Sequence, residues 1–322
     1  MKHAKLPSLL ATAMLFCAAA AAQDYPARPI RMVVPFPPGG GVDIAARVTA
    51  QKFIESWGQQ VIVDNRGGAG GVIAMDIAAK AAPDGYTLIM GAAGPVAITV
   101  SLYAKVPFDP VRDFAPVALA ASTLYALAVH PGVPAKSVKE LIAYSKANPK
   151  RLTFASTGIG SPPHLSGELL KSMTGADMTH VPYKGTGPAL TDLMGGQVSL
   201  MFSDVIAAYP HIKAGKLRAL AISSASRAKI APELPTVAEA GVPGYAAVGW
   251  TGLLAPAGTP RGIINKLNAE IVRILPLPDV TERLAGDGSE FDKNTPEQFA
   301  AFIKSEIAKW SNVIKASGAK AE

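Results

Sequence analysis

Cysteine is nearly absent from this chain of 322 residues. The single one, Cys17, lies in an apolar run from Leu9 to Ala22 that follows Lys2 and Lys5. This run ends in three alanines, which is the pattern of a secretory signal peptide cleaved near Ala22. Its length of about 14 residues is short for a membrane span. We therefore expect an exported protein whose mature chain has no disulfide, thiol nucleophile or cysteine metal site.

Motifs for nucleotides, metals and hydrolysis are also missing. No G-x-x-x-x-G-K-[ST] loop occurs, and the glycines at 39–41 lack the G-x-G-x-x-G spacing because Ile44 stands in the third place. There is no G-x-S-x-G elbow, and the five histidines are dispersed without a metal-binding spacing. The sequence therefore predicts no catalytic residue, no metal and no cofactor.

The positively charged residues are spread along the sequence and are not concentrated in one segment. The formal net charge is +7, yet Lys and Arg form neither a cluster nor a stripe. A nucleic-acid partner is therefore not expected. A net positive body mildly favours an anionic ligand.

Short β-rich runs alternate with helical patterns, which is typical of an α/β protein. We expect the chain to leave a first lobe between the strands 116–119 and 125–129 and to return near Trp250. The predicted lobes are 23–123 with 248–322, and 124–247, after a signal peptide at 1–22. The other expected strands are 30–34, 61–63, 87–90, 152–154, 179–182, 198–202, 217–222 and 250–255.

Helices are expected where apolar residues recur at helical spacing. A helix begins near Asp43, another covers 72–82, and one after Pro163 carries Leu165, Leu169 and Met173 on one face. Pro188 lies in the first turn of a further helix. Capping boxes are expected at Ser137 with Glu140 and at Thr295 with Gln298, and another helix begins after Thr259-Pro260.

Three loops place glycines directly before a helix start, at 35–43, 67–72 and 156–164. Glycine lets a ligand approach the backbone closely, and a helix start adds uncovered N–H groups with a partial positive charge. Such loops hold a carboxylate or phosphate without a charged side chain. Three or four N–H bonds of about 1.5–3 kcal/mol each support micromolar capture. Any one loop alone is more readily explained as a tight strand-to-helix turn.

Some side chains near these loops allow two interpretations. Asp204, at the end of an apolar run, either accepts from an amine or hydroxyl of a ligand or caps the next turn. Phe36 and Tyr183 either form a cleft wall or cover a domain edge. Ser161 and His164 resemble a nucleophile and base, but capping a helix and contacting a ligand suits them better. His180 is interpreted as structural, and cationic partners for a distal carboxylate are sought among Arg47, Arg66 and Lys184.

Several segments in this order resemble one family, the Bug-type substrate-binding proteins of tripartite tricarboxylate transporters. The stretch from Tyr25 to Arg47 looks like the opening of these proteins. The similarity continues through Gly158-Ile159-Gly160-Ser161 with His164-Leu165 and Gly167-Glu168-Leu169, His180-Val181-Pro182-Tyr183-Lys184-Gly185, Gly215–Ala221 and Gly252–Pro260. It covers essentially the whole chain after the signal peptide.

The resemblance implies a periplasmic-binding-protein fold of the second type, in which crossing strands join two α/β lobes around a ligand cleft. The implied ligand-binding positions are Phe36, Gly39, Gly40, Asp43, Ser156, Gly158, Gly160, Ser161, His164 and Tyr183, to which our own reasoning adds Asp204. Two departures from the family pattern lie near this cleft. Pro162-Pro163 replaces small polar residues, and Ser203-Asp204 stands where Asp more often follows Phe directly.

We therefore expect a periplasmic, monomeric solute-binding protein that closes around a small organic carboxylate like a Venus flytrap. The family's ligands are dicarboxylates, tricarboxylates, amino acids and aromatic acids, and its partners are the transporter's membrane subunits. Alternatives are a receptor that presents its ligand to a sensor protein and a secreted hydrolase on the same fold.

Overall fold

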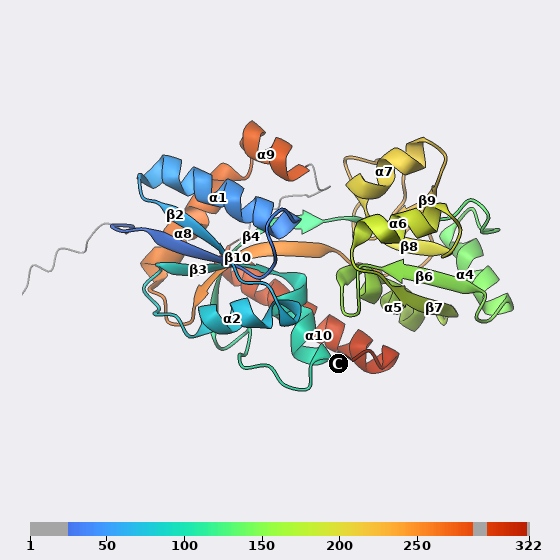
Figure 1. The fold of residues 1–322 in the computed structure, drawn as a ribbon, viewed down its shortest axis with the longest axis horizontal. Helices are drawn as coiled ribbons and strands as arrows, with labels where there is room; N and C mark the ends of the chain where they lie inside the picture. The colour runs from blue at the N-terminus through green and yellow to red at the C-terminus, as the bar shows by residue number, and fades with distance from the viewer. Residues whose placement is uncertain (1–24, 286–294, 321–322) are drawn as a thin grey trace, which may run out of the picture.

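Two five-stranded sheets form the framework of the protein (Figure 1). The computed structural model describes residues 25–285 and 295–320, so the predicted signal peptide lies outside the described residues. The first sheet has the order β2-β1-β3-β10-β4 and the second the order β7-β6-β8-β5-β9. Their strands are β1 Ile30–Val34, β2 Val61–Asn65, β3 Thr87–Ala92, β4 Phe114–Thr123, β5 Tyr125–Val129, β6 Leu152–Ser156, β7 Met178–Pro182, β8 Leu200–Asp204, β9 Arg218–Ile222 and β10 Gly249–Pro256.

The chain passes between the sheets twice. Only Leu124 separates β4 from β5, and these two strands belong to different sheets. The chain returns through β10, which pairs antiparallel with β4 from Gly249 opposite Thr123 onwards. The sequence analysis expected the chain to cross between residues 119 and 125 and to return near Trp250, and the change of sheet at Leu124 and the start of β10 lie at these places.

Helices cover the two sheets on both faces. Alternate residues of β1 show this: Met32 packs in one cluster with Phe53 of α1, and Val33 packs in another with Ala74 of α2. The helices of the first lobe are α1 Gly41–Trp57, α2 Val72–Ala79, α3 Thr99–Leu102, α8 Arg261–Ile274, α9 Pro278–Ala285 and α10 Pro296–Ser317. Those around the second sheet are α4 Val138–Ala147, α5 Pro162–Thr174, α6 Thr186–Met194 and α7 Val205–Lys213.

Two details of the predicted helices are wrong. Leu165 and Leu169 are buried in α5, but Met173 is 41% exposed. Met173 lies eight positions after Leu165, and in a helix of 3.6 residues per turn this rotates it by roughly 80° from the buried face. Leu170 completes the buried stripe instead.

The Ser137 hydroxyl accepts from Glu140 N–H, but the Glu140 carboxylate accepts from the Lys136 amide and not from the Ser137 amide, so the predicted capping box is not closed. The box at Thr295 and Gln298 is confirmed in both directions.

Helix α10 connects the two lobes. It packs against β4 of the first sheet and against α5 of the second lobe (Figure 1). One continuous apolar cluster accordingly includes Ile89 of β3, Leu127 of β5, Leu165 of α5 and Trp310 of α10. The lobes are therefore joined by a packed helix as well as by the crossing strands.

A buried carboxylate lies at this junction. Glu306 of α10 is 4% exposed and accepts hydrogen bonds from the indole N–H groups of Trp250, at 3.2 Å, and Trp310, at 2.9 Å. It also forms an ion pair with Lys309, whose ammonium donates to the carbonyl of Ala246 at 3.2 Å. Glu306 thus ties the start of β10 to α10.

Replacement of Glu306 by alanine is expected to destabilise the protein by about 3 kcal/mol, because two indole N–H groups and an ammonium lose their acceptor. Chemical denaturation followed by circular dichroism measures this change. Lys304→Ala, on the exposed side of the same helix, is the control and should change the free energy of unfolding by less than about 0.5 kcal/mol. Equal effects of the two substitutions would contradict the assignment.

Candidate functional site

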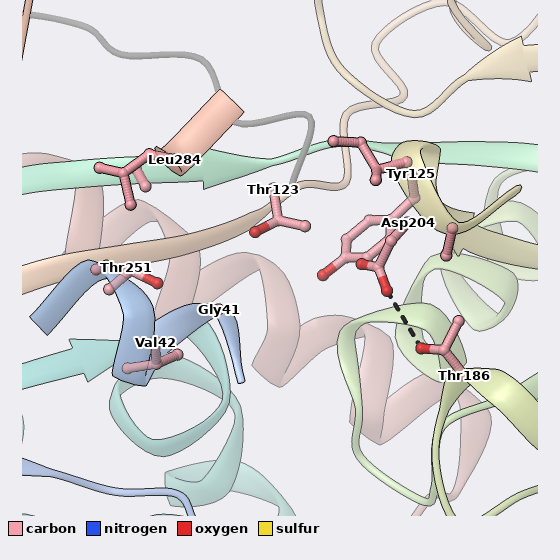
Figure 2. A pocket seen from close by; sticks show the side chains of 12 residues that line it. Gly41, Val42, Thr123, Tyr125, Thr186, Asp204, Thr251 and Leu284 are labelled. Carbon is pink, nitrogen blue, oxygen red and sulfur yellow. Dashed lines mark hydrogen bonds between the residues drawn. The ribbon is translucent and has the colours of Figure 1, made fainter. Parts of the chain in front are cut away.

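A cleft lies between the lobes, in two adjoining hollows of about 370 and 520 Å³. The hollows share Gly41 and Val42 at the start of α1, Tyr125 of β5, Thr186 of α6 and Asp204 at the end of β8. Figure 2 shows the α1 residues on one side and Tyr125, Thr186 and Asp204 on the other. We call this space the interlobe cleft.

We call the hollow of about 520 Å³ the outer one; its wall consists largely of proline and aromatic rings and of glycines. The inner hollow, of about 370 Å³, reaches the crossing strands β4 and β10. The outer hollow is completed by Phe36, Pro37, Pro38, Gly40, Thr157, Pro162, Pro163 and Gly185. The inner one is completed by Ala45, Ala121, Thr123, Thr251, Ile206, Ala207 and Leu284. No described lining residue is Lys or Arg, so Arg47, Arg66 and Lys184 do not line it. Helix ends are the positive groups that the described lining of the cleft presents.

The first turn of α1 supplies such an end. Its N-cap residue, Gly40, has an extended backbone and provides no side-chain cap. Gly40, Gly41 and Val42 all line the cleft. The first N–H groups of a helix have no partner within the helix, and they carry its partial positive charge. The end of α1 therefore suits an anion.

Asp43 stabilises this loop from behind and does not line the described cleft. Its carboxylate accepts from Gly39 N–H, Arg47 Nε and Asn65 Nδ2, each at 2.9 Å. Asn65 also donates to the carbonyl of Phe36 at 2.9 Å. Burial opposes the Asp43 charge, but the bonds from Arg47, Gly39 and Asn65 outweigh it and lower the pKa of this carboxyl. Gly39 and Asp43 thus hold the loop in shape, and their predicted contact with ligand stays a prediction.

The facing lobe presents α6 and Asp204. Gly185, with φ of 114°, precedes α6 without a side-chain cap, and both Gly185 and Thr186 line the cleft. The Thr186 hydroxyl donates to the Asp204 carboxylate at 3.2 Å (Figure 2). Asp204 stands at the N-cap position of α7, but its side chain makes no capping bond there. Asp204 thus lines the cleft and does not cap the next turn, and its acceptance of a hydrogen bond from a ligand stays a prediction.

The loop 156–164 does not supply the uncovered amides that its glycines predicted. Pro162 and Pro163 occupy the first two positions of α5 and have no N–H. Ser161 Oγ accepts from His164 N–H at 3.4 Å, and Gly160 N–H donates to His164 Nδ1 at 3.0 Å. The start of α5 is therefore closed by its own side chains, and two proline rings face the cleft instead.

The loop 67–72, the second glycine loop considered for anion binding, also differs from that expectation. It lies outside the lining of both hollows. Gly71 N–H donates to the carbonyl of Gly68, and a side chain on Gly71 would meet Pro95 at 2.5 Å. This glycine loop is a tight turn, which was the alternative explanation for any single loop.

The remaining predicted residues bond among themselves beside the cleft. His164 and His180 stack with ring centroids 3.8 Å apart, and Ser156 Oγ lies 2.6 Å from His180 Nε2. Ser156 also exchanges hydrogen bonds with Gly158. The Tyr183 hydroxyl donates to the Asp192 carboxylate at 2.7 Å. Burial is the larger cause and this hydrogen bond the smaller cause that raise the pKa of Tyr183 to about 12. Among the predicted site residues, Phe36, Gly40 and Asp204 line the cleft, and contact of every predicted residue with a ligand stays a prediction.

Tyr125, Thr186 and Thr123 were not predicted for the site. Burial, reinforced by the charge of Asp204, raises the pKa of Tyr125 far above its usual range. The position of Tyr125, one residue after the crossing, is a signal that could have identified it, because both lobes meet there. Nothing in the local sequence distinguishes Thr186 from an ordinary helix start.

Metal and membrane features were also sought in the described ranges, 25–285 and 295–320. No group of three or more His, Cys, Asp and Glu residues there could hold a metal ion. None of the helices in those ranges combines the length and the apolar character needed to cross a membrane.

The stacked histidines make stability depend on pH. Burial lowers the pKa of His164 to about 3 and that of His180 to about 4, so both stay neutral in the folded protein. In the unfolded chain a histidine has a pKa of about 6.5, so below this pH the unfolded chain binds protons that the folded chain does not. The free energy of unfolding should therefore fall, by about 1.4 kcal/mol per pH unit for each imidazole, between pH 6 and 4. Denaturation at several pH values measures this slope.

His180→Gln should remove roughly half of this pair's contribution to the slope. His211→Gln, in α7 and outside the pair, serves as the control and should keep the wild-type slope. An unchanged slope in folded His180→Gln protein would show that the pair does not cause it.

The sequence and the structure were compared with known proteins. The model of the tripartite tricarboxylate transporter family receptor, TctC, matches residues 45–319. Protein BugT of Bordetella pertussis is 42% identical over 319 residues, covering 97% of this chain and 98% of BugT. A protein from the tcbD-tcbE intergenic region of Pseudomonas sp. (strain P51) is 42% identical over 291 residues, covering 90% of this chain and 86% of that one.

Solved structures of similar fold include two with bound acids. R. palustris Rpa4515 with adipate has a TM-score of 0.78 and 40% identity, covering 92% of this chain and 99% of that chain. MatC from Rhodopseudomonas palustris with bound malate has a TM-score of 0.74 and 38% identity, covering 90% of this chain and 100% of that chain. The resemblance seen in the sequence and the expected two-lobed fold are confirmed. The chain belongs to the TctC family of tripartite tricarboxylate transporter receptors.

Proposed function

We propose that this receptor binds a small organic carboxylate in the interlobe cleft, as a periplasmic protein, and delivers it to the membrane subunits of a tripartite transporter. The observation that supports this most directly is the uncapped first turn of α1, which lines the cleft. Two solved structures of similar fold hold dicarboxylates, adipate and malate. An anion at the end of α1 replaces the hydrogen-bond partners that the helix itself lacks.

The two lobes suggest how binding is signalled. Gly41 and Val42 lie on one wall of the cleft, and Thr186 lies on the other. A ligand that contacts both walls stabilises a closed form over an open one, by its differential affinity for the two. We propose that a closed monomer is the form that the membrane subunits recognise.

Three further features belong to this proposal. Export depends on the N-terminal segment, with cleavage near Ala22 releasing the mature chain. The lobes are bounded at 23–123 with 248–322, and 124–247. The protein acts by binding and not by catalysis; this is supported by the described lining of the cleft, which consists of glycine, proline, threonine, tyrosine and apolar residues together with Asp204.

The amide of Gly41 offers a sharp test. Proline is well tolerated at the first position of a helix, and the extended backbone of Gly40 suits a following proline. Gly41→Pro should therefore keep the fold and remove one N–H from the cleft. One hydrogen bond to a charged group contributes about 1.5–3 kcal/mol, so affinity for a carboxylate found by a thermal-shift panel should fall about 10–100-fold. Isothermal titration calorimetry measures the loss.

Gly41→Ala is the matched comparison, because it adds a side-chain carbon and keeps the N–H. Its affinity should fall much less than that of Gly41→Pro. Equal losses would mean that bulk, and not the amide, matters. If no mono-, di- or tricarboxylate or amino acid shifts the melting temperature of the wild-type protein, the proposed function is wrong.

A further inference from the structure

We infer that three hydroxyls beside the crossing strands bind an oxygen substituent of the ligand, so that the receptor selects hydroxy or oxo acids over unsubstituted acids of the same skeleton. The hydroxyls belong to Thr123 of β4, Tyr125 of β5 and Thr251 of β10, and all three residues line the inner hollow. We call them the hydroxyl cluster. This inference rests on the proposed function and specifies its ligand.

The pairing of the crossing strands brings two of these hydroxyls to one face. In the antiparallel pair of β4 and β10, Thr251 lies opposite Ala121 and Gly249 lies opposite Thr123. Residues two apart on a strand point to the same side, so Thr123 and Thr251 share the face that lines the inner hollow. Their direct partners on this face are an alanine and a glycine, which are too small to cover a hydroxyl. Figure 2 shows the oxygens of both threonines directed into the space between the walls.

The glycine at position 249 makes room for the third hydroxyl. A side-chain carbon on Gly249 would lie 2.3 Å from the hydroxyl oxygen of Tyr125 and 3.1 Å from Cβ of Thr123. The Tyr125 hydroxyl therefore occupies the place that a side chain at 249 would fill, beside Thr123. The second lobe thus adds its hydroxyl to the two on the crossing strands.

The hydroxyl cluster is buried and lacks partners in the protein. Thr251 is 6% exposed and Tyr125 is 5% exposed. Within the described ranges, no hydrogen bond is formed by the hydroxyls of Thr123, Tyr125 or Thr251. Thr186, in the same hollow, differs because its hydroxyl donates to Asp204 at 3.2 Å. Buried polar side chains are nearly always hydrogen-bonded in proteins, so a group of three without partners points to a ligand atom that completes them.

The position of the cluster fits a substituent on an acid held at α1. Gly41 and Val42, at the uncapped start of this helix, line the same hollow. Threonine and tyrosine hydroxyls donate and accept, so they match a hydroxyl in either role and can donate to a keto oxygen. A C–H group in that place would leave the hydroxyls unpaired when the cleft closes, and a site built for a polar group rejects the analogue that lacks it.

The first experiment compares acids of one skeleton by calorimetry on the wild-type protein. The matched sets are propionate with lactate and pyruvate, phenylacetate with mandelate, succinate with malate, and tricarballylate with citrate. Within each set the number of carboxylates is constant and only the hydroxyl or keto oxygen differs. In the set that binds best, the oxygenated acid should bind at least fivefold more tightly than the unsubstituted one.

The outcomes separate this inference from the proposed function. An unsubstituted acid that binds within fivefold of its oxygenated counterpart overturns the inference and leaves the proposed function standing. Binding confined to acids without a hydroxyl or keto group has the same meaning. If no acid of these sets or of the wider panel binds, both are overturned.

Thr251→Val tests the cluster directly, because it removes one hydroxyl and keeps the shape of the side chain. It should lower the ratio of the two affinities at least threefold, and the midpoint of chemical denaturation should not fall, since the lost hydroxyl had no partner in the protein. Thr179→Val, at an exposed position of the edge strand β7 and outside the described lining of the cleft, is the matched control and should keep the wild-type ratio.

Tyr125→Phe provides an independent variant, because it removes the hydroxyl contributed by the second lobe and keeps the ring. It should lower the same ratio of affinities at least threefold. If the ratio is unchanged in both folded variants, the hydroxyl cluster does not bind the substituent and the inference is overturned.

Discussion

The uncapped first turn of α1 is the feature on which the cleft depends. A helix start requires partners for its N–H groups, and most helices obtain one from a Ser, Thr, Asp or Asn at the N-cap. Here the N-cap is glycine, and the nearest acidic side chain, Asp43, is bonded to Gly39, Arg47 and Asn65. These bonds hold the loop in shape, and they cover the amide of Gly39 but place no side-chain cap on the first turn of α1. A ligand can complete what the helix lacks.

The second lobe uses similar sequence for a different purpose. Its loop 156–164 also combines glycines with a helix start, but Ser161, His164 and two prolines close it. His164 stacks on His180 of β7, and His180 contacts Ser156 at the end of β6, so this closed turn is linked to both strands. Donors to a ligand in this lobe must come from elsewhere, and the start of α6 is the nearest candidate.

The sequence predicted the framework well because its signals are local. Strand-forming runs, glycine turns and the cap at Thr295 depend on neighbours in the chain, so the two α/β lobes and their crossing could be foreseen. The lining of the cleft depends on how the lobes meet. Phe36 and Gly40 were expected from the glycine loop after the first strand and from the family resemblance, and Asp204 from its place at the end of an apolar strand. Thr186 and Thr123 carry no local mark. The start of α5 was misjudged because glycines were counted without subtracting the N–H groups that prolines lack.

The fold and the lining therefore carry different information. The fold, its crossing strands and the shared packing around α10 establish the receptor architecture, and these features tolerate much sequence change as long as the cores stay apolar. Ligand choice depends on a few groups on opposite walls. An uncapped helix end on one wall suits a negative charge, and the other wall presents Asp204, two proline rings and the start of α6. Receptors of the same architecture can thus select different acids by changing the residues at the starts of α5 and α7.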